Sequence, residues 1–336
     1  METINTKQFI LDAKGRLQGK DARRMAAFHT GVAAAAALVV TLLQYALEQG
    51  IGNTAGLSGM GTRAILQTVQ TVLQWANTIL APFWNLGFVY VALLWARDQY
   101  ARKEDLLTGF HRIGPCIGLL VTRLILTFSV VVICANVCSA IYMSLPVSEE
   151  LWKLMPQVET VDAMYAYMDQ MTPEQYTQML YAMLPVLVLC LVLSVALLVP
   201  LLYRFRLAEY AVLNQKGVRA MPAMIISAVL MRRRCWQLFK LDLRFWWYYG
   251  LKVLCMLLCN LDLLLRAAGV TLPIGGDGAF FGSYILYLAA WLAVETAFRP
   301  LVQTAYAGVY EAFVAAGPVQ RKQVSAPAKN VPWDEQ

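Results

Sequence analysis

The stretch MLYAMLPVLVLCLVLSVALLVPLL, residues 179–202, decides the fold class. A helix needs about 20 mostly apolar residues to cross a hydrocarbon core about 30 Å thick. This stretch is long enough, and it carries no charged residue. Arg204 and Arg206 follow it directly. We interpret it as a transmembrane helix that ends at a basic loop.

Five other stretches have comparable length and apolar character. Together they predict six spans, over residues 25–47, 71–95, 117–143, 179–202, 246–265 and 280–298. Composition agrees, because 59% of the residues are hydrophobic and 15% charged, against about 45–50% and about 25% in soluble domains. The predicted fold class is all-α, a polytopic helical membrane protein. The second span contains Asn77, Pro82 and Asn85, so a re-entrant segment is the alternative there.

The basic residues predict the orientation of these spans. They gather before the first span, after the second, after the fourth and after the sixth. Only Arg63, Arg123, Lys153 and Arg266 of the 28 Lys and Arg residues lie elsewhere, if Lys252, near the start of the fifth span, is counted with the connection before it. Cytoplasmic loops of membrane proteins carry the excess of Lys and Arg. We therefore predict that both ends lie inside the cell.

The segments outside the spans complete the predicted domain organisation. Residues 1–24 form a cytoplasmic amphipathic segment, and residues 25–315 the six-helix transmembrane domain. Within that domain, residues 146–178 are predicted to form an extracellular lid. Thr172-Pro173-Glu174-Gln175 fits a capping box with proline at the first helical position, so a helix is expected to start there and continue into the fourth span. Residues 316–336, with several Pro and polar residues, are predicted to be a disordered cytoplasmic tail.

The stretch RAMPAMIISAVLMRRRCWQLFKLDLRFWWYY, residues 219–249, is the most distinctive of the connections. We predict a cytoplasmic interfacial helix over residues 219–245, because its Trp and Phe rings favour the membrane interface. The basic side chains Arg232, Arg233, Arg234 and Lys240 are candidate contacts for anionic lipid, each contributing about 1 kcal/mol near the surface. Over the whole chain the cations lie next to predicted spans and are interrupted by apolar residues, so the net charge of +7 indicates membrane lipids as partners rather than nucleic acid.

Part of this stretch also resembles a known family. SAVLMRRRCWQLFKLDLRFWWYY is similar to the signature S-x-x-L-M-x-G-x-x-x-x-L-F-x-L-x-L-S-F-x-x-W of the bacterial integral membrane proteins called domain of unknown function 975. Three other segments look similar: AKGRLQGK at 13–20, EDLLTGF at 104–110 and RPLVQTAYAGVYE at 299–311. Arg233 and Arg244 replace an expected Gly and Ser. The resemblance implies a multi-pass protein of the bacterial cytoplasmic membrane and implies no activity.

Ionisable residues inside membrane spans cost free energy, and such residues mark candidate functional sites. Arg123 lies in the third span and Glu295 in the sixth, both near the inner end, so we expect them to pair. The pair would either lock two helices together or line an inward-facing polar cavity. Asp262 and Arg266, four residues apart, are expected to form a local ion pair.

No catalytic motif, cofactor-binding motif or metal-ligand pattern is present in the sequence. His29 and His111 are the only histidines, and neither accompanies a set of cysteines or carboxylates. We therefore expect a protein that is not an enzyme and that acts through lipid or protein contacts at the cytoplasmic membrane. A small-solute transporter or channel, with a path along Asn77, Asn85, Arg123 or Glu295, is the first alternative. A membrane-embedded enzyme is the second.

Overall fold

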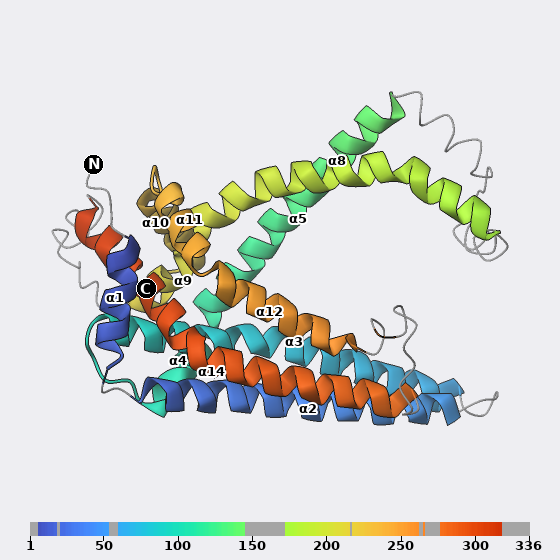
Figure 1. Ribbon diagram of the computed structural model, residues 1–336, viewed down its shortest axis with the longest axis horizontal. Coiled ribbons are helices and arrows are strands. Elements are labelled where there is room, and N and C mark those ends of the chain that lie inside the picture. Colours follow the sequence, from blue (N-terminus) through green and yellow to red (C-terminus); the bar gives the residue numbers. More distant parts are fainter. Residues whose placement is uncertain are drawn as a thin grey trace, which may run out of the picture. The chain divides into compact units, whose positions relative to one another are not determined.

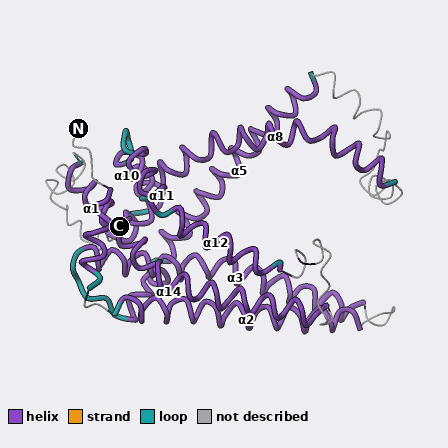
Figure 2. Tube along the Cα trace, in the orientation of Figure 1, coloured by secondary structure: helices purple, strands orange, loops and turns teal. Residues whose placement is uncertain are grey.

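The computed structural model describes residues 6–18, 21–53, 60–144, 172–215, 217–261, 265 and 276–317. These residues are almost entirely helical, and no strand occurs among them (Figures 1 and 2). The chain divides into two compact units. The first combines Met1–Ile117 with Leu207–Gln336, and the second is Gly118–Arg206.

Long helices form the body of the first unit. They are α2 (Ala22–Asn53), α3 (Met60–Ala96), α12 (Trp246–Cys259) and α14 (Gly276–Ala316). The helix α14 packs against the other three, and α2 packs against α3 (Figure 1). Much of their surface is apolar and exposed, including Val39, Leu42 and Ile285, as expected of helices that face lipid.

Short helices cluster at one end of the same unit. They are α1 (Thr6–Arg16), η2 (Lys103–Leu107), α4 (Thr108–His111), α9 (Ala208–Asn214), α10 (Ala220–Leu230) and α11 (Cys235–Arg244). The largest fully buried side chains of the unit lie here and on the adjoining turns of α3 and α14, among them Phe88, Leu106, Leu213, Tyr310 and Phe313. This end therefore contains the hydrophobic core.

Two glycines let η2 and α4 lie directly on α3. A Cβ atom added at Gly87 would lie 1.7 Å from the carbonyl oxygen of Leu106, and one added at Gly109 would lie 2.1 Å from that of Phe83. Such distances are far below van der Waals contact, so both positions require glycine. The turn after the second span is thus fixed tightly to that span.

The second unit consists mainly of two long helices that cross each other, α5 (Ile113–Met143) and α8 (Pro173–Phe205) (Figure 1). The Tyr142 hydroxyl donates to the Ala182 carbonyl at 2.8 Å, and the Arg123 guanidinium donates to the Phe205 carbonyl at 2.7 Å. The predicted helix start is confirmed: the Thr172 hydroxyl accepts from the Gln175 amide, and the Gln175 side chain accepts from the Thr172 amide.

Five of the six predicted spans correspond to helices that are long and apolar enough to cross a membrane: Ala22–Gly50, Ala64–Ala96, Ile113–Met143, Thr177–Asn214 and Phe281–Ala316. The segment predicted to span at 246–265 contains the helix α12, whose 14 residues extend about 21 Å at 1.5 Å per residue. Six spans therefore stay a prediction. Asp262 and Arg266, most of the predicted lid and residues 318–336 lie outside the described residues.

One predicted element is wrong. The stretch 219–245 is not one helix, because α10 ends at Leu230 and α11 begins at Cys235. Arg233, in the turn between them, has φ of 63°, a left-handed conformation that cannot continue a right-handed helix. The last apolar helix, α14, extends beyond the predicted span 280–298. It continues through Pro300 to Ala316, because the added turns pack against α1 and the core.

Candidate functional site

The carboxylate of Glu295 lies at the centre of a buried polar cluster in the first unit. Its Oε1 accepts a hydrogen bond from the Tyr248 hydroxyl at 3.0 Å and lies 2.8 Å from Lys252 Nζ. Its Oε2 lies 3.4 Å from Arg299 Nη1. Three donors from two helices therefore converge on one carboxylate whose side chain is 2% exposed.

Helical spacing explains why these four residues meet. Glu295 and Arg299 are four apart on α14, and Tyr248 and Lys252 are four apart on α12. Residues at this spacing lie on one helix face, one turn apart. Because α12 packs against α14, the two pairs face each other across a single interface.

Arg299 extends the cluster to α2 and α3. Its Nη2 donates to Asn85 Oδ1 at 2.9 Å, and its Nη1 lies 3.4 Å from His29 Nδ1. The guanidinium also stacks over the Phe88 ring, 4.6 Å from its centroid. Arg299 thus connects three long helices, which matches the ability of a guanidinium to donate in several directions. We call His29, Asn85, Tyr248, Lys252, Glu295 and Arg299 the Glu295 cluster.

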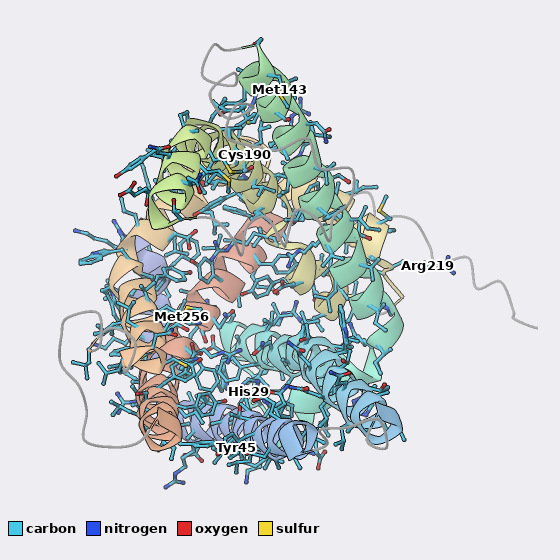
Figure 3. All side chains as sticks on the ribbon, turned by 90° about the vertical axis from the view of Figure 1, so that its right-hand side faces the viewer. His29, Tyr45, Met143, Cys190, Arg219 and Met256 are labelled. Atoms are coloured by element: carbon cyan, nitrogen blue, oxygen red, sulfur yellow. The ribbon has the colours of Figure 1, made fainter. Side chains whose placement is uncertain are left out.

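His29 is held in place by a reciprocal pair of hydrogen bonds with Trp84. The Trp84 indole N–H donates to the His29 carbonyl at 2.9 Å, and His29 Nε2 lies 2.9 Å from the Trp84 carbonyl. A carbonyl only accepts, so Nε2 carries the proton, and Nδ1 of the neutral ring is the acceptor that faces Arg299. The two rings are stacked, with centroids 4.9 Å apart. Figure 3 shows His29 among the helices of this unit.

The polar atoms of the Glu295 cluster are paired with one another and hold four helices together. Both carboxylate oxygens are occupied, and the histidine uses both ring nitrogens. Lys252, whose side chain is 42% exposed, connects the cluster to the protein surface. Among the described residues, no group of three His, Cys, Asp or Glu side chains is placed to hold a metal ion.

A second set of contacts joins the four basic segments. Arg97, after the second span, pairs with Glu311 of α14 at 2.6 Å, and it also contacts Asn214 of α9. Arg112 donates to the carbonyls of Val212 and Leu213 at 2.9 and 2.7 Å. Arg16 of α1 donates to the Ala96 carbonyl. The segments predicted to be cytoplasmic therefore meet at one end of the first unit.

The two residues predicted to pair inside the membrane lie in different units. Arg123 binds the Phe205 carbonyl, and Glu295 binds Lys252 and Arg299. Their pairing stays a prediction. The sequence argument missed Tyr248, Lys252 and Arg299 as partners of Glu295, because it treated Arg299 and Lys252 as loop cations. The spacing of four residues between Glu295 and Arg299 was a signal in the sequence for that one ion pair.

Three of the four predicted lipid contacts are exposed, namely Arg232, Arg233 and Lys240. Arg234 differs, because its guanidinium donates to the Phe313 carbonyl at 3.3 Å and lies over the Phe313 ring. It attaches the turn between α10 and α11 to α14.

Searches against known protein families, characterised proteins and solved structures find no match to this chain.

Proposed function

We propose that this chain is a six-span protein of the bacterial cytoplasmic membrane with both ends inside, and that it binds anionic lipid at its cytoplasmic surface without catalysing a reaction. Five long apolar helices support the membrane part of this proposal. The meeting of the four basic segments at one end of the first unit supports the topology, because segments on one side of a membrane can meet and segments on opposite sides cannot.

The exposed face of α11 is the observation that carries the lipid proposal. Leu238 and Leu241 on one face are buried. On the other face, Trp236 is 64% exposed and stacks on Phe239 with ring centroids 5.1 Å apart, and Lys240 lies over the Trp236 ring. Aromatic rings beside exposed cations are typical of a helix that lies in the headgroup region.

Lipid retention tests the proposal. The full-length protein is reconstituted in nanodiscs of phosphatidylcholine with and without phosphatidylglycerol, and bound lipid is measured by native mass spectrometry after gentle extraction. We expect the triple variant Arg232→Gln, Arg233→Gln, Lys240→Gln to lose phosphatidylglycerol selectivity, since each exposed cation contributes about 1 kcal/mol.

The matched control removes three exposed cations from other elements, through Lys14→Gln, Arg23→Gln and Arg102→Gln. It makes the same change in net charge without touching α11 or the turn that precedes it. Retention of anionic lipid that falls equally in both triple variants would refute a specific α11 site and leave only a general charge effect.

We also propose that the chain belongs to the family called domain of unknown function 975. In support, the signature positions Leu230, Met231, Leu238 and Phe245 are buried in the core. Buried Ser227 accepts a hydrogen bond from the Leu207 amide at 3.2 Å. The position where the family signature has Gly is the left-handed Arg233. These residues thus have packing roles that a shared signature would preserve.

Small-solute transport is the second candidate, favoured by the way Arg299 joins Asn85 to Glu295. Two residues of the predicted path are therefore connected. Osmotic swelling of proteoliposomes, followed by light scattering with sugars, amino acids and inorganic ions outside, tests it. Swelling equal to that of empty liposomes is expected from the lipid-binding proposal, and solute-specific swelling would favour transport.

A further inference from the structure

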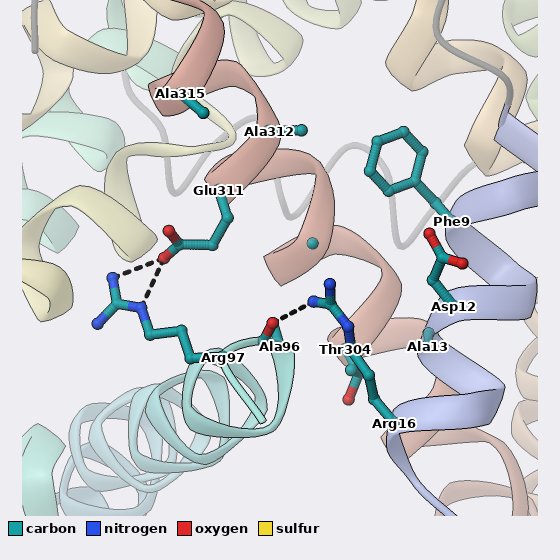
Figure 4. Close-up of a pocket in the computed structure, with 11 residues that line it drawn as sticks. Phe9, Asp12, Ala13, Arg16, Ala96, Arg97, Thr304, Glu311, Ala312 and Ala315 are labelled. Atoms are coloured by element: carbon teal, nitrogen blue, oxygen red, sulfur yellow. Dashed lines mark hydrogen bonds and ion pairs between the residues drawn. The ribbon is translucent and has the colours of Figure 1, made fainter. Parts of the chain in front are cut away.

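A pocket of about 350 Å³ lies between α1, the end of α3 and the last turns of α14, entirely within the first unit (Figure 4). Its volume falls in the range of small-molecule sites, about 300–1,000 Å³. Apolar lining comes from Phe9, Ala13 and Ala96 and from small residues of α14. Polar lining comes from Asp12, Arg16, Arg97, Thr304 and Glu311.

Several contacts hold the walls of this pocket in place. Ala13 is buried, and Phe9 packs beside Gly308, where an added Cβ would lie 3.6 Å from the ring. Arg16 donates to the Ala96 carbonyl and lies 3.8 Å from Asp98. The α1 helix is therefore attached at both of its ends, and the pocket is a built feature of the fold.

The pocket contains both positively charged donors and negatively charged acceptors of hydrogen bonds. Arg97 uses Nε and Nη2 in its contacts with Glu311 and Asn214, so its Nη1 stays available as a donor. Glu311 uses Oε1, and its Oε2 is available as an acceptor. Asp12 forms no ion pair with any residue that the structure describes, although Arg16 lies one turn away on the same helix.

A buried hydroxyl in the wall lacks a partner. Thr304 is 1% exposed, and its Oγ1 makes no hydrogen bond within the described part of the chain. A buried polar group without a partner costs roughly 1–3 kcal/mol. Because this oxygen has almost no accessible surface, it lies behind the lining, and a ligand reaches it only if the wall shifts.

These groups discriminate between classes of ligand. A simple anion would face the carboxylates of Asp12 and Glu311, and a simple cation would face the guanidinium groups of Arg16 and Arg97. A molecule with both charges satisfies both sets, because each of its ends meets the opposite charge. Phe9 adds an aromatic face beside Asp12 that suits an ammonium group.

We propose that this pocket binds a small zwitterion, with an ammonium group toward Asp12 and the Phe9 ring and a carboxylate or phosphate toward Arg16, while the Arg97–Glu311 ion pair forms the opposite wall (Figure 4). The molecule is either free in the cytoplasm or the headgroup of a zwitterionic lipid. This inference does not depend on the lipid contacts of α11.

Thermal unfolding of the detergent-purified full-length protein tests the inference. The zwitterionic probes are β-alanine and O-phosphoethanolamine, and the singly charged probes are ethanolamine, acetate and inorganic phosphate. We expect a saturable rise in Tm with a zwitterion and a smaller or no rise with the singly charged probes. A parallel measurement in nanodiscs with and without phosphatidylethanolamine distinguishes a lipid headgroup from a free molecule.

Two variants locate the effect. Asp12→Asn removes an exposed charge and is expected to weaken apparent zwitterion affinity at least about tenfold, because a charged hydrogen-bond partner is lost. Ala312→Leu is expected to block the pocket. Glu104→Gln, which removes an exposed acid outside the pocket, is the control. Absence of a zwitterion effect in both detergent and nanodiscs, or an equal effect in Asp12→Asn and Glu104→Gln, would overturn the inference.

Discussion

At the residue scale, Glu295 has the most demanding environment in the first unit. It compensates two cations, of which Arg299 is buried and Lys252 is half-exposed. Removing one member of a buried ion pair leaves an uncompensated charge, at a cost of about 3–5 kcal/mol. The cost is smaller where the remaining charge reaches water.

We therefore expect Glu295→Gln to lower the free energy of unfolding by several kcal/mol, on the order of 3, because Arg299 stays buried. Lys252→Met is expected to cost about 1 kcal/mol or less, because its side chain is partly exposed. Equilibrium unfolding in mixed micelles measures both. Equal costs for the two variants would show that burial of Arg299 does not govern the stability of the Glu295 cluster.

Arg233 is a second residue whose conformation predicts an outcome. A left-handed conformation costs a non-glycine residue roughly 1–2 kcal/mol, and glycine adopts it freely. Arg233→Gly is expected to raise the free energy of unfolding by about 0.5–1 kcal/mol after its greater entropy in the unfolded state is counted. Arg232→Gly, at the preceding position where φ is not positive, is the control and should bring no gain.

At the scale of elements, the sequence predicted the features that depend on residues close together in the chain. The capping box at Thr172 was confirmed, because both of its hydrogen bonds join residues three apart in the chain. The break at Arg233 was missed, because the sequence around it is apolar and basic throughout and contains no glycine or proline there. The extension of α14 past Pro300 was missed because it depends on contacts with α1, far away in sequence.

The close approach of α3 to η2 and α4 predicts another outcome at this scale. Gly109→Ala is expected to destabilise the protein by about 3 kcal/mol or more, because the added Cβ overlaps the Phe83 carbonyl and forces the backbone to move. Gly250→Ala, in α12, is the control. Its Cβ meets no atom within 4 Å, so helix propensity alone should stabilise it by up to about 1 kcal/mol. Thermal unfolding compares the two.

At the scale of the whole molecule, the length of the apolar stretches predicted the helical class and six spans, of which five correspond to long apolar helices. Charge placement predicted which segments share a side of the membrane, and this stays a prediction. The sequence did not predict the partners of Glu295. They depend on which faces of α2, α3, α12 and α14 meet, and the sequence of each helix does not specify its neighbours.

Cysteine labelling tests the proposed topology. In a cysteine-free background, Ser144→Cys should react with a membrane-impermeant maleimide in intact cells, whereas Arg102→Cys should react only after the membrane is opened. The segment 246–265 is tested in the same way by Lys240→Cys and Gly269→Cys, which the six-span proposal assigns to opposite sides. Reaction of positions 240 and 269 from the same side would reduce the number of spans to five.

The length of α14 has a mechanical consequence for α1. The 41 residues of α14 extend about 62 Å, roughly twice the thickness of a bilayer core. The 16 residues beyond Pro300 form an arm about 24 Å long, and α1 rests on that arm. A tilt of roughly 10° in the apolar part would move the far end by about 4 Å, so a change in bilayer thickness, which tilts helices, would be transmitted as a displacement of α1.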